Sequence, residues 1–352
     1  MIEGLKGKFY PTTTGSLPYK DPKVACEKVL KNFSEIPFWP QLIRRSFLEN
    51  MYVQFAGGFP GVVVDQPEKK IYVDTSDAAQ ISGEVERLYE KVLNDDVDFF
   101  SIGRDHAEGL YALVEEIKAS GAKPKFAKGQ ITGPVSFGLT VTDEKKRPLF
   151  YNTELKEVLI KTLCMRARWQ VRKLKETGAE GVIIFIDEPY LASIGSSFIS
   201  LQKEDVVSTL NEVAEAIHKE GGICGMHCCG NTDWGLVLES GIEILNFDAY
   251  NFSDSLLLYP AELKKFLGRG GLLAWGIVPN TQDIRSETAD TLIARLSDAA
   301  GRLAKKGIKK EEIFNSMIIS PTCGLGLIDD ELAELVIKRT IEISEMLRKL
   351  KF

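Results

Sequence analysis

The sequence predicts an α/β protein built as a single (β/α)8 TIM barrel. Eight β-like apolar runs alternate with amphipathic helical segments over 352 residues, and this pattern favours a barrel over an open doubly wound sheet. No glycine-rich dinucleotide or Walker fingerprint follows any of these runs, which weakens the open-sheet alternative. Residues 1–352 are therefore expected to form one catalytic domain, with an insertion between the second and third strands.

The first two expected strands lie near the N-terminus. Phe9–Thr14 is a β-like run that ends in the turn sequence Gly15-Ser16-Leu17-Pro18, and Ile36–Leu42 is short, apolar and punctuated by prolines. Between them, Pro22 falls in the first turn of a helix expected over Asp21–Asn32, a position where proline is favoured. These segments give the first strand–helix–strand unit.

Residues 44–122 are too many for one crossover and are expected to form an insertion that caps one end of the barrel. We predict a helix over Ser46–Phe55, followed by a hairpin over Gly61–Asp74, where two β-branched or aromatic runs flank a polar turn. Two further helices are expected over Asp77–Asn94 and His106–Ser120.

From residue 124 onward the alternation is regular, with a short apolar run before each helical pattern. The expected strands are Pro124–Ile131, Gly181–Asp187, Gly222–Cys229, Ile242–Asp248, Gly271–Val278 and Ser316–Ser320. The expected helices are Glu154–Thr177, Lys203–Glu220, Thr232–Ser240, Ala261–Leu267, Glu287–Lys305 and Asp329–Leu350.

The composition is that of a water-soluble globular protein, with 44% hydrophobic and 27% charged residues. A net charge of −6 without a Lys/Arg-rich block argues against a nucleic-acid partner. The apolar runs are too short to span a bilayer, and the N-terminus has no apolar signal core. We therefore expect a cytoplasmic protein with no membrane partner, in which the six cysteines serve as thiols, ligands or core residues.

The strand expected at Gly222–Cys229 ends in residue types that bind metals. Side chains alternate along a strand, so His227 and Cys229 point to one side while Cys224 and Cys228 point to the other. An imidazole and a thiolate roughly 6–7 Å apart on one strand face can close on one ion. A buried histidine beside a buried cysteine is the alternative interpretation, because free cysteine is among the most buried residue types.

A third soft ligand strengthens the metal hypothesis. Cys323 follows the last expected strand, so a barrel would place it at the same mouth as His227 and Cys229. One histidine and two cysteines with one open or carboxylate-filled position are typical of catalytic zinc, since thiolates favour zinc over magnesium or calcium. Asp248, at the end of another strand, is a candidate fourth ligand, and an oxygen from water or substrate is the alternative. Cys323 in a tight turn without a function is the structural alternative.

Other polar residues at strand ends are candidates for substrate binding. Asp187 and Glu188 follow a fully apolar strand, where two acids cost desolvation free energy unless they meet cations or a metal. Salt bridges to neighbouring loops are the structural alternative. Gly15 and Ser16 offer a backbone amide and a hydroxyl that suit a carboxylate, although the same residues are ordinary turn formers.

Together these residues resemble the catalytic barrel of cobalamin-independent methionine synthase. This family belongs to the superfamily of uroporphyrinogen decarboxylase and methylcobalamin:coenzyme M methyltransferases. The matching segments are Pro11–Pro18, Ile186-Asp187-Glu188-Pro189, His227-x-Cys229 and Cys323-Gly324, in the same order along the barrel, and Gln130–Pro134 resembles the wider superfamily. The resemblance implies a zinc enzyme that transfers a methyl group to the sulfur of homocysteine, giving methionine.

Carried over by position, the resemblance implies that His227, Cys229 and Cys323 hold zinc. The synthase's fourth ligand is a glutamate, and the nearest position here is Asp248, which is one methylene shorter. Asp187 matches the carboxylate that holds the homocysteine amine and is the expected catalytic residue. Ser16, with Gly15, would lie by the homocysteine carboxylate.

The chain also departs from the synthases. It is too short to contain their second, N-terminal barrel, which helps to bind methyl-folate, and the insertion at 44–122 looks unlike theirs. Short synthase-like proteins take the methyl group from a methylcorrinoid, so methylcobalamin or a corrinoid carrier protein is an expected donor beside methyl-folate. Three rivals follow: a thiol methyltransferase acting on coenzyme M, a porphyrinogen-type decarboxylase without zinc, and a non-catalytic corrinoid- or metal-binding protein.

Overall fold

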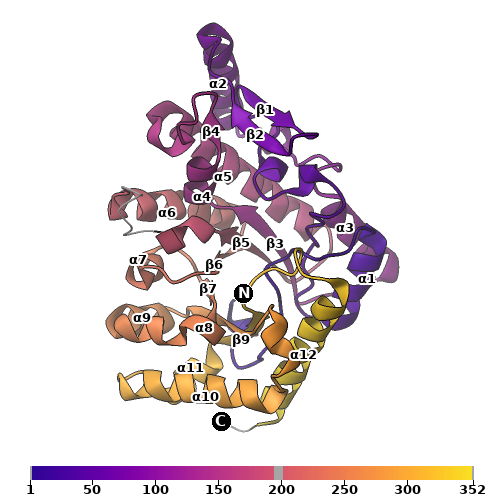
Figure 1. Ribbon diagram of the computed structural model, residues 1–352, viewed down its shortest axis with the longest axis vertical. Helices are drawn as coiled ribbons and strands as arrows, with labels where there is room; N and C mark the ends of the chain where they lie inside the picture. The colour runs from indigo at the N-terminus through magenta and orange to yellow at the C-terminus, as the bar shows by residue number, and fades with distance from the viewer. Residues whose placement is uncertain (1, 194–200, 351–352) are drawn as a thin grey trace.

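Six parallel strands form the centre of the protein, in the order β3-β5-β6-β7-β8-β9. The computed structural model describes residues 2–193 and 201–350. The sheet is curled, and helices cover its outer side in Figure 1. The central strands are β3 (Phe126–Thr132), β5 (Gly181–Asp187), β6 (Ile223–Cys228), β7 (Ile244–Phe247), β8 (Leu272–Val278) and β9 (Met317–Pro321). The expected α/β class and the last six expected strands are confirmed.

The prediction of two regular N-terminal strands in the barrel is wrong. Their segments meet the sheet only at isolated bridges, where Pro11 pairs with Ile319 of β9 and Phe38 pairs with Lys128 of β3. The two segments bridge each other at Ser16 and Gln41. Prolines such as Pro11 lack the N–H that a ladder requires. The sheet is therefore a six-stranded half-barrel flanked by irregular chain, and a full eight-stranded barrel is not confirmed.

Helices follow most of the expected positions. Asp21 caps α1 by accepting a hydrogen bond from the Lys23 amide at 2.8 Å, and Pro22 opens the helix as expected. The short helices α4, α8 and α11 were not expected from the sequence. The helices are α1 (Pro22–Asn32), α2 (Ala78–Leu93), α3 (Glu108–Ser120), α4 (Pro134–Thr140), α5 (Thr153–Lys175), α6 (Lys203–Lys219), α7 (Trp234–Glu239), α8 (Ala249–Phe252), α9 (Pro260–Gly268), α10 (Ala289–Lys305), α11 (Lys310–Asn315) and α12 (Asp330–Lys349).

The segment 44–122 contains the expected hairpin but not its expected first helix. Strands β1 (Val62–Asp65) and β2 (Lys70–Val73) are antiparallel, and β2 also pairs with β4 (Thr142–Asp143), which lies outside the segment. The helix expected over Ser46–Phe55 is replaced by short 3-10 turns at Phe47–Glu49 and Val53–Phe55. In Figure 1 the hairpin and α2 lie beyond α5, at the end of the molecule away from both termini.

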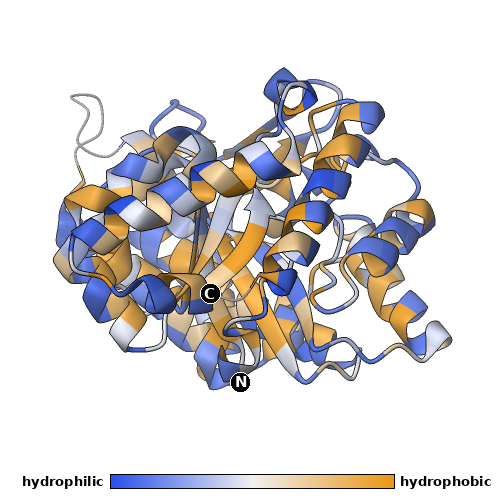
Figure 2. Ribbon diagram, turned by 90° about the horizontal axis from the view of Figure 1, so that it is seen from below, coloured by the Kyte–Doolittle hydropathy of each residue, from blue (hydrophilic) through white to orange (hydrophobic). Residues whose placement is uncertain are grey.

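The two sides of the curled sheet have different cores. Inside the curl, a small apolar cluster includes Phe126, Ile183, Ile223 and Ile318. Outside, a much larger cluster joins the sheet to the helices, and Figure 2 shows apolar strands at the centre with polar residues on outward helix surfaces. Among the described helices, none combines the length and apolar character needed to cross a bilayer. The inner face above the small cluster is where polar side chains gather.

Candidate metal centre

Strand β6 separates its cysteines and histidine by face, as the alternation predicts. Cys224 and Cys228 are fully buried on the outer side, where their thiols donate to the carbonyl oxygens of Gly225 and Gly230. Burial raises the pKa of Cys228 to about 12, so this thiol stays protonated. His227 points inward and is 5% exposed, and Cys229 follows the strand end, half-buried.

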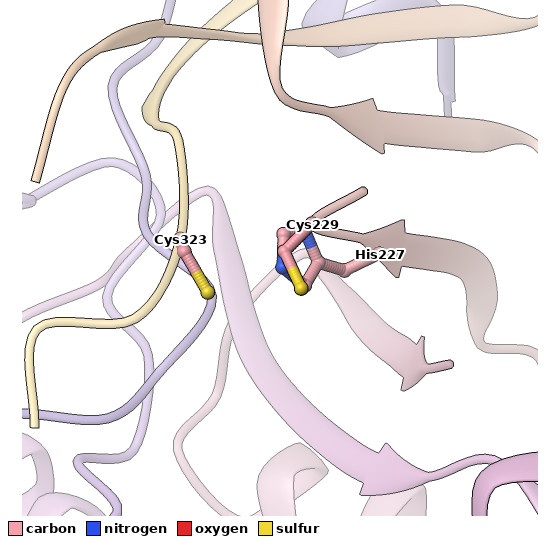
Figure 3. Close-up of side chains that lie close together, drawn as sticks. All are labelled: His227, Cys229 and Cys323. Carbon is pink, nitrogen blue, oxygen red and sulfur yellow. The ribbon is translucent and has the colours of Figure 1, made fainter. Parts of the chain in front are cut away.

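Three potential ligands converge at the mouth of the curl. One ligand atom each from His227, Cys229 and Cys323 all lie within 4.8 Å of one another. Figure 3 shows Cys323 on a separate loop, with its sulfur directed toward the pair from the end of β6. That loop follows β9, so the contact depends on the curl that brings β9 and β6 to one mouth.

The electrostatics of this cluster suit a metal ligand set. The neighbouring Cys323 thiol, and next the imidazole of His227, lower the pKa of Cys229 to about 4, whereas the pKa of Cys323 is raised well above its ordinary value by the Cys229 thiolate and by burial. Burial opposes protonation of His227, but Cys229 and Asp187 outweigh it and raise the pKa of His227.

Both ring nitrogens of His227 are buried, and neither has a hydrogen-bond partner in the described part of the chain. Buried polar atoms without partners are rare in folded proteins and call for an explanation. A thiolate, a thiol and an unpartnered imidazole within reach of one point fit a zinc ion better than a hard cation.

A cavity of about 280 Å3 opens onto these ligands. Its lining comes from the strand ends of the inner face and from the two irregular N-terminal segments. The lining residues are Thr14, Ser16, Gln41, Ile43, Asn50, Met51, Asp187, Pro189, His227, Cys229, Cys323, Gly324 and Leu327. The described lining contains no lysine or arginine.

Asp187 lies in this cavity beside the ligands. It is the register partner of His227 on the adjacent strand, and its Oδ1 is buried without a hydrogen-bond partner among the described residues. Burial raises the pKa of Asp187 to about 6, although His227 and Lys128 act in the opposite direction. The carboxyl is therefore available to a donor that enters the cavity.

Ser16 lines the cavity, whereas Gly15, which precedes it, is not among the lining residues. The backbone of Gly15 has φ of +135°, and a Cβ there would lie 2.4 Å from the Gln130 side chain, so the position requires glycine. The Oγ of Ser16 lines the cavity and accepts a hydrogen bond from the Gly326 amide at 3.3 Å. The hydroxyl proton of Ser16 remains available for a second contact.

Glu188 and Asp248 are held elsewhere. Glu188 is fully buried and accepts hydrogen bonds from the Val135 and Ser136 amides, at 3.0 and 2.7 Å, at the start of α4. Asp248 caps α8, where its two oxygens accept from the amide and the side chain of Asn251. Neither residue lines the cavity, and Asp248 is not among the three clustered ligands.

Lys128 lies inside the curl near Asp187 and was not predicted as a site residue from the sequence. Its Nζ donates to the Thr14 carbonyl at 3.1 Å and lies 4.2 Å from the centre of the Phe185 ring. Burial lowers the pKa of Lys128 to about 7, and Asp187 opposes this effect. The period-two pattern of β3 places Lys128 on the same face as Gln130, and this alternation is the signal that could have identified it.

Comparisons with known proteins give a distant structural likeness. No family model matches the chain, and no curated protein matches it. One similar solved structure is the B12-independent methionine synthase from Shewanella sp. W3-18-1 in complex with selenomethionine, at 16% identity and a TM-score of 0.45. The match covers 67% of this chain and 66% of the Shewanella chain, slightly less than two thirds of its length.

A second similar structure is a putative vitamin-B12 independent methionine synthase from Listeria monocytogenes. It matches at 13% identity and a TM-score of 0.47, over 95% of this chain and 97% of that chain. At these identities and TM-scores neither likeness assigns a function to this chain. Function is therefore inferred from the residues at the cavity.

Proposed function

We propose that this protein is a zinc-dependent methyltransferase that transfers a methyl group to the sulfur of homocysteine, giving methionine. The observation that carries the proposal is the convergence of His227, Cys229 and Cys323 within 4.8 Å at a cavity that also exposes Asp187. Soft metal ligands beside an unpartnered carboxylate match a substrate that has both a thiol and an amine.

His227, Cys229 and Cys323 would hold the zinc ion. When bound, zinc lowers the pKa of a coordinated thiol, so that the thiol is a nucleophilic thiolate at neutral pH, whereas a free thiol with a pKa near 8.5 is mostly protonated. Asp248 is engaged with Asn251, which supports a site with three protein ligands and one position left for the substrate.

The chain's other cavity residues would position the acceptor. The Asp187 carboxylate would accept hydrogen bonds from the ammonium group, and the Ser16 hydroxyl would donate to the carboxylate. A cavity of about 280 Å3 lies just below the range of roughly 300–1,000 Å3 typical of drug-sized ligands, so a small amino acid is a suitable occupant.

The same lining argues against two rivals. A porphyrinogen carries several carboxylates and a sulfonate thiol carries a strong acid, and both would need cations. The described lining has no lysine or arginine, and Asp187 would repel either anion. An amine-bearing thiol is therefore the favoured acceptor.

The donor would be a methylcorrinoid, free or on a carrier protein, or methyl-folate. In either case the acceptor sulfur forms a bond to the methyl carbon while the methyl–donor bond breaks. The electron pair of that bond stays with the donor, which leaves as a reduced corrinoid or as a folate nitrogen that takes up a proton.

The direct test incubates the zinc-loaded protein with homocysteine and either methylcobalamin or methyl-folate, and measures methionine. Methionine formed from at least one donor supports the proposal, and its absence with both donors contradicts it. A parallel reaction with coenzyme M as acceptor should give far less product.

Strand β6 supplies a matched control, because two adjacent cysteines point to opposite sides. Cys229→Ala should lower the zinc affinity by more than about 100-fold, beyond the loss typical of changes around the ligands. Cys228→Ala removes the same sulfur from the outer side and should keep both zinc and activity. Equal zinc content in the two variants would count against the assigned ligands.

A further inference from the structure

Helix α5 carries a buried arginine without a counterion. Arg166 is 4% exposed, and no carboxylate of the described residues forms an ion pair with it. Its Nη2 donates to the Gly57 carbonyl oxygen, and its Nε is buried without a hydrogen-bond partner. Arg168, two residues further along, is similarly buried but pairs with Asp95 and Glu220.

An unpaired buried charge is costly, because desolvation is not offset by an opposite charge. Burial lowers the pKa of Arg166 only to about 10, so the guanidinium remains charged at neutral pH. Arginine presents a planar set of N–H donors that matches a carboxylate or phosphate. The chain therefore retains a desolvated cation whose natural partner is an anion.

Arg166 lines a cavity of about 730 Å3 between α5, α2 and the β1–β2 hairpin. Phe59, Phe99 and Phe100 supply aromatic walls, and Phe99 is 36% exposed at the rim. The guanidinium of Arg87 lies over the Phe99 ring, 5.5 Å from its centre. This cavity shares no lining residue with the metal cavity.

The acids of the same cavity are engaged by local donors. Glu84 accepts from the Gly61 amide, Asp77 from the Gln80 amide at the start of α2, and Asp74 from the Ser76 amide. None of them neutralises Arg166. Three carboxylates against Arg87 and Arg166 leave the lining with a net charge of −1, which would repel a doubly charged phosphate more strongly than a singly charged anion.

We propose that this cavity binds a small organic carboxylate, with its charge paired to Arg166 and its apolar or aromatic body against Phe59, Phe99 and Phe100. A net-acidic rim around one desolvated guanidinium selects a monocarboxylate over a phosphate ester. The site is independent of the metal centre and of the proposed methyl transfer.

The test measures the binding of three probes to the full chain by calorimetry, with and without zinc. Phenylacetate has the proposed features, 2-phenylethanol has the same body without the charge, and phenyl phosphate carries a doubly charged group. Phenylacetate should bind at least about tenfold more tightly than either of the others. Equal affinities, or no saturable binding of phenylacetate at millimolar concentration, would overturn the proposal.

Variants assign the binding to the cavity. Arg166→Met should abolish the preference for phenylacetate over 2-phenylethanol. Phe99→Ala, at the exposed rim, should weaken the binding of all three probes without affecting folding. Phenylacetate should raise the melting temperature of the wild type but not that of Arg166→Met, because a ligand stabilises only the state that binds it. If Arg166→Met does not fold, unchanged phenylacetate affinity in Phe99→Ala contradicts the proposal.

Discussion

Asp187 and His227 are register partners on the neighbouring parallel strands β5 and β6. Both side chains line the same cavity at the mouth of the curled sheet. Each has a buried polar atom without a hydrogen-bond partner among the described residues. This pairing places the carboxylate proposed to bind the amine beside the imidazole proposed to bind zinc.

Asp187→Asn should slow methyl transfer to homocysteine more than methyl transfer to thiols without an amine. A hydrogen bond to a charged group contributes about 1.5–3 kcal/mol, so kcat/KM for homocysteine should fall by about 10- to 100-fold. With 4-mercaptobutyrate, which lacks the amine, the change should be small, and the zinc content should stay the same. Equal losses of kcat/KM for both acceptors would mean that Asp187 does not bind the amine.

Lys128→Met should change the pH profile of the reaction. The charge of Lys128 lowers the pKa of Asp187, which burial raises to about 6. Without that charge the pKa of Asp187 rises further, so the acid limb of kcat/KM for homocysteine should move to higher pH. Lys125→Met, which removes a lysine from the exposed pair with Glu180, is the matched control and should leave the profile unchanged.

Glu188 should make stability fall as the pH rises toward neutrality. Burial raises the pKa of Glu188 from an ordinary 4.5 to about 7, so the folded state binds a proton that the unfolded state has lost between these values. The free energy of unfolding should therefore decrease from about pH 4.5 to about pH 7, by on the order of 1–3 kcal/mol. Burial also raises the pKa values of Glu49 and Asp187, so denaturant titrations of Glu188→Gln should show a smaller decrease and not its complete loss. An identical slope in both proteins would contradict the assignment.

Arg168 should stabilise the folded protein, whereas Arg166 should not. The side chain of Arg168 is 5% exposed, and its Nη2 lies 2.7 Å from Glu220 Oε1 while Nη1 pairs with Asp95. Removing Arg168 should cost less than the loss of a fully buried pair, because Asp95 is half exposed and keeps Lys219 and Glu220 keeps Arg172. The lost charge-assisted hydrogen bonds correspond to about 1.5–3 kcal/mol. Urea unfolding should show a loss of this order for Arg168→Met and little or no loss for Arg166→Met.

Much of the central fold follows from sequence patterns. The apolar runs that form β5, β6 and β8 are short and buried, and the side-chain alternation along β6 is enough to distinguish Cys229 from Cys228. The segments at residues 9–14 and 36–42 failed as strands because their prolines interrupt the ladder. These two segments contact the sheet only at isolated positions, and the periodicity of apolar residues in the sequence does not predict such contacts.

The positions of the acidic side chains around the candidate site were harder to predict from the sequence than those of its cysteines. Asp248 ends a strand, as a ligand would, but the same position begins α8, and its side chain caps that helix through Asn251. Glu188 likewise binds the amides at the start of α4. A sequence does not reveal which of two neighbouring acids turns toward a helix start, so Asp187 and Glu188 could not be distinguished.

The measurement that tests the central claim most directly is zinc-edge X-ray absorption of the zinc-loaded protein, with and without homocysteine. We predict one zinc ion per chain with the sulfurs of Cys229 and Cys323 at about 2.3 Å. Homocysteine should add one further sulfur to the zinc. A protein that takes up no zinc, or a sulfur shell that homocysteine leaves unchanged, would contradict the proposed zinc-dependent methyl transfer.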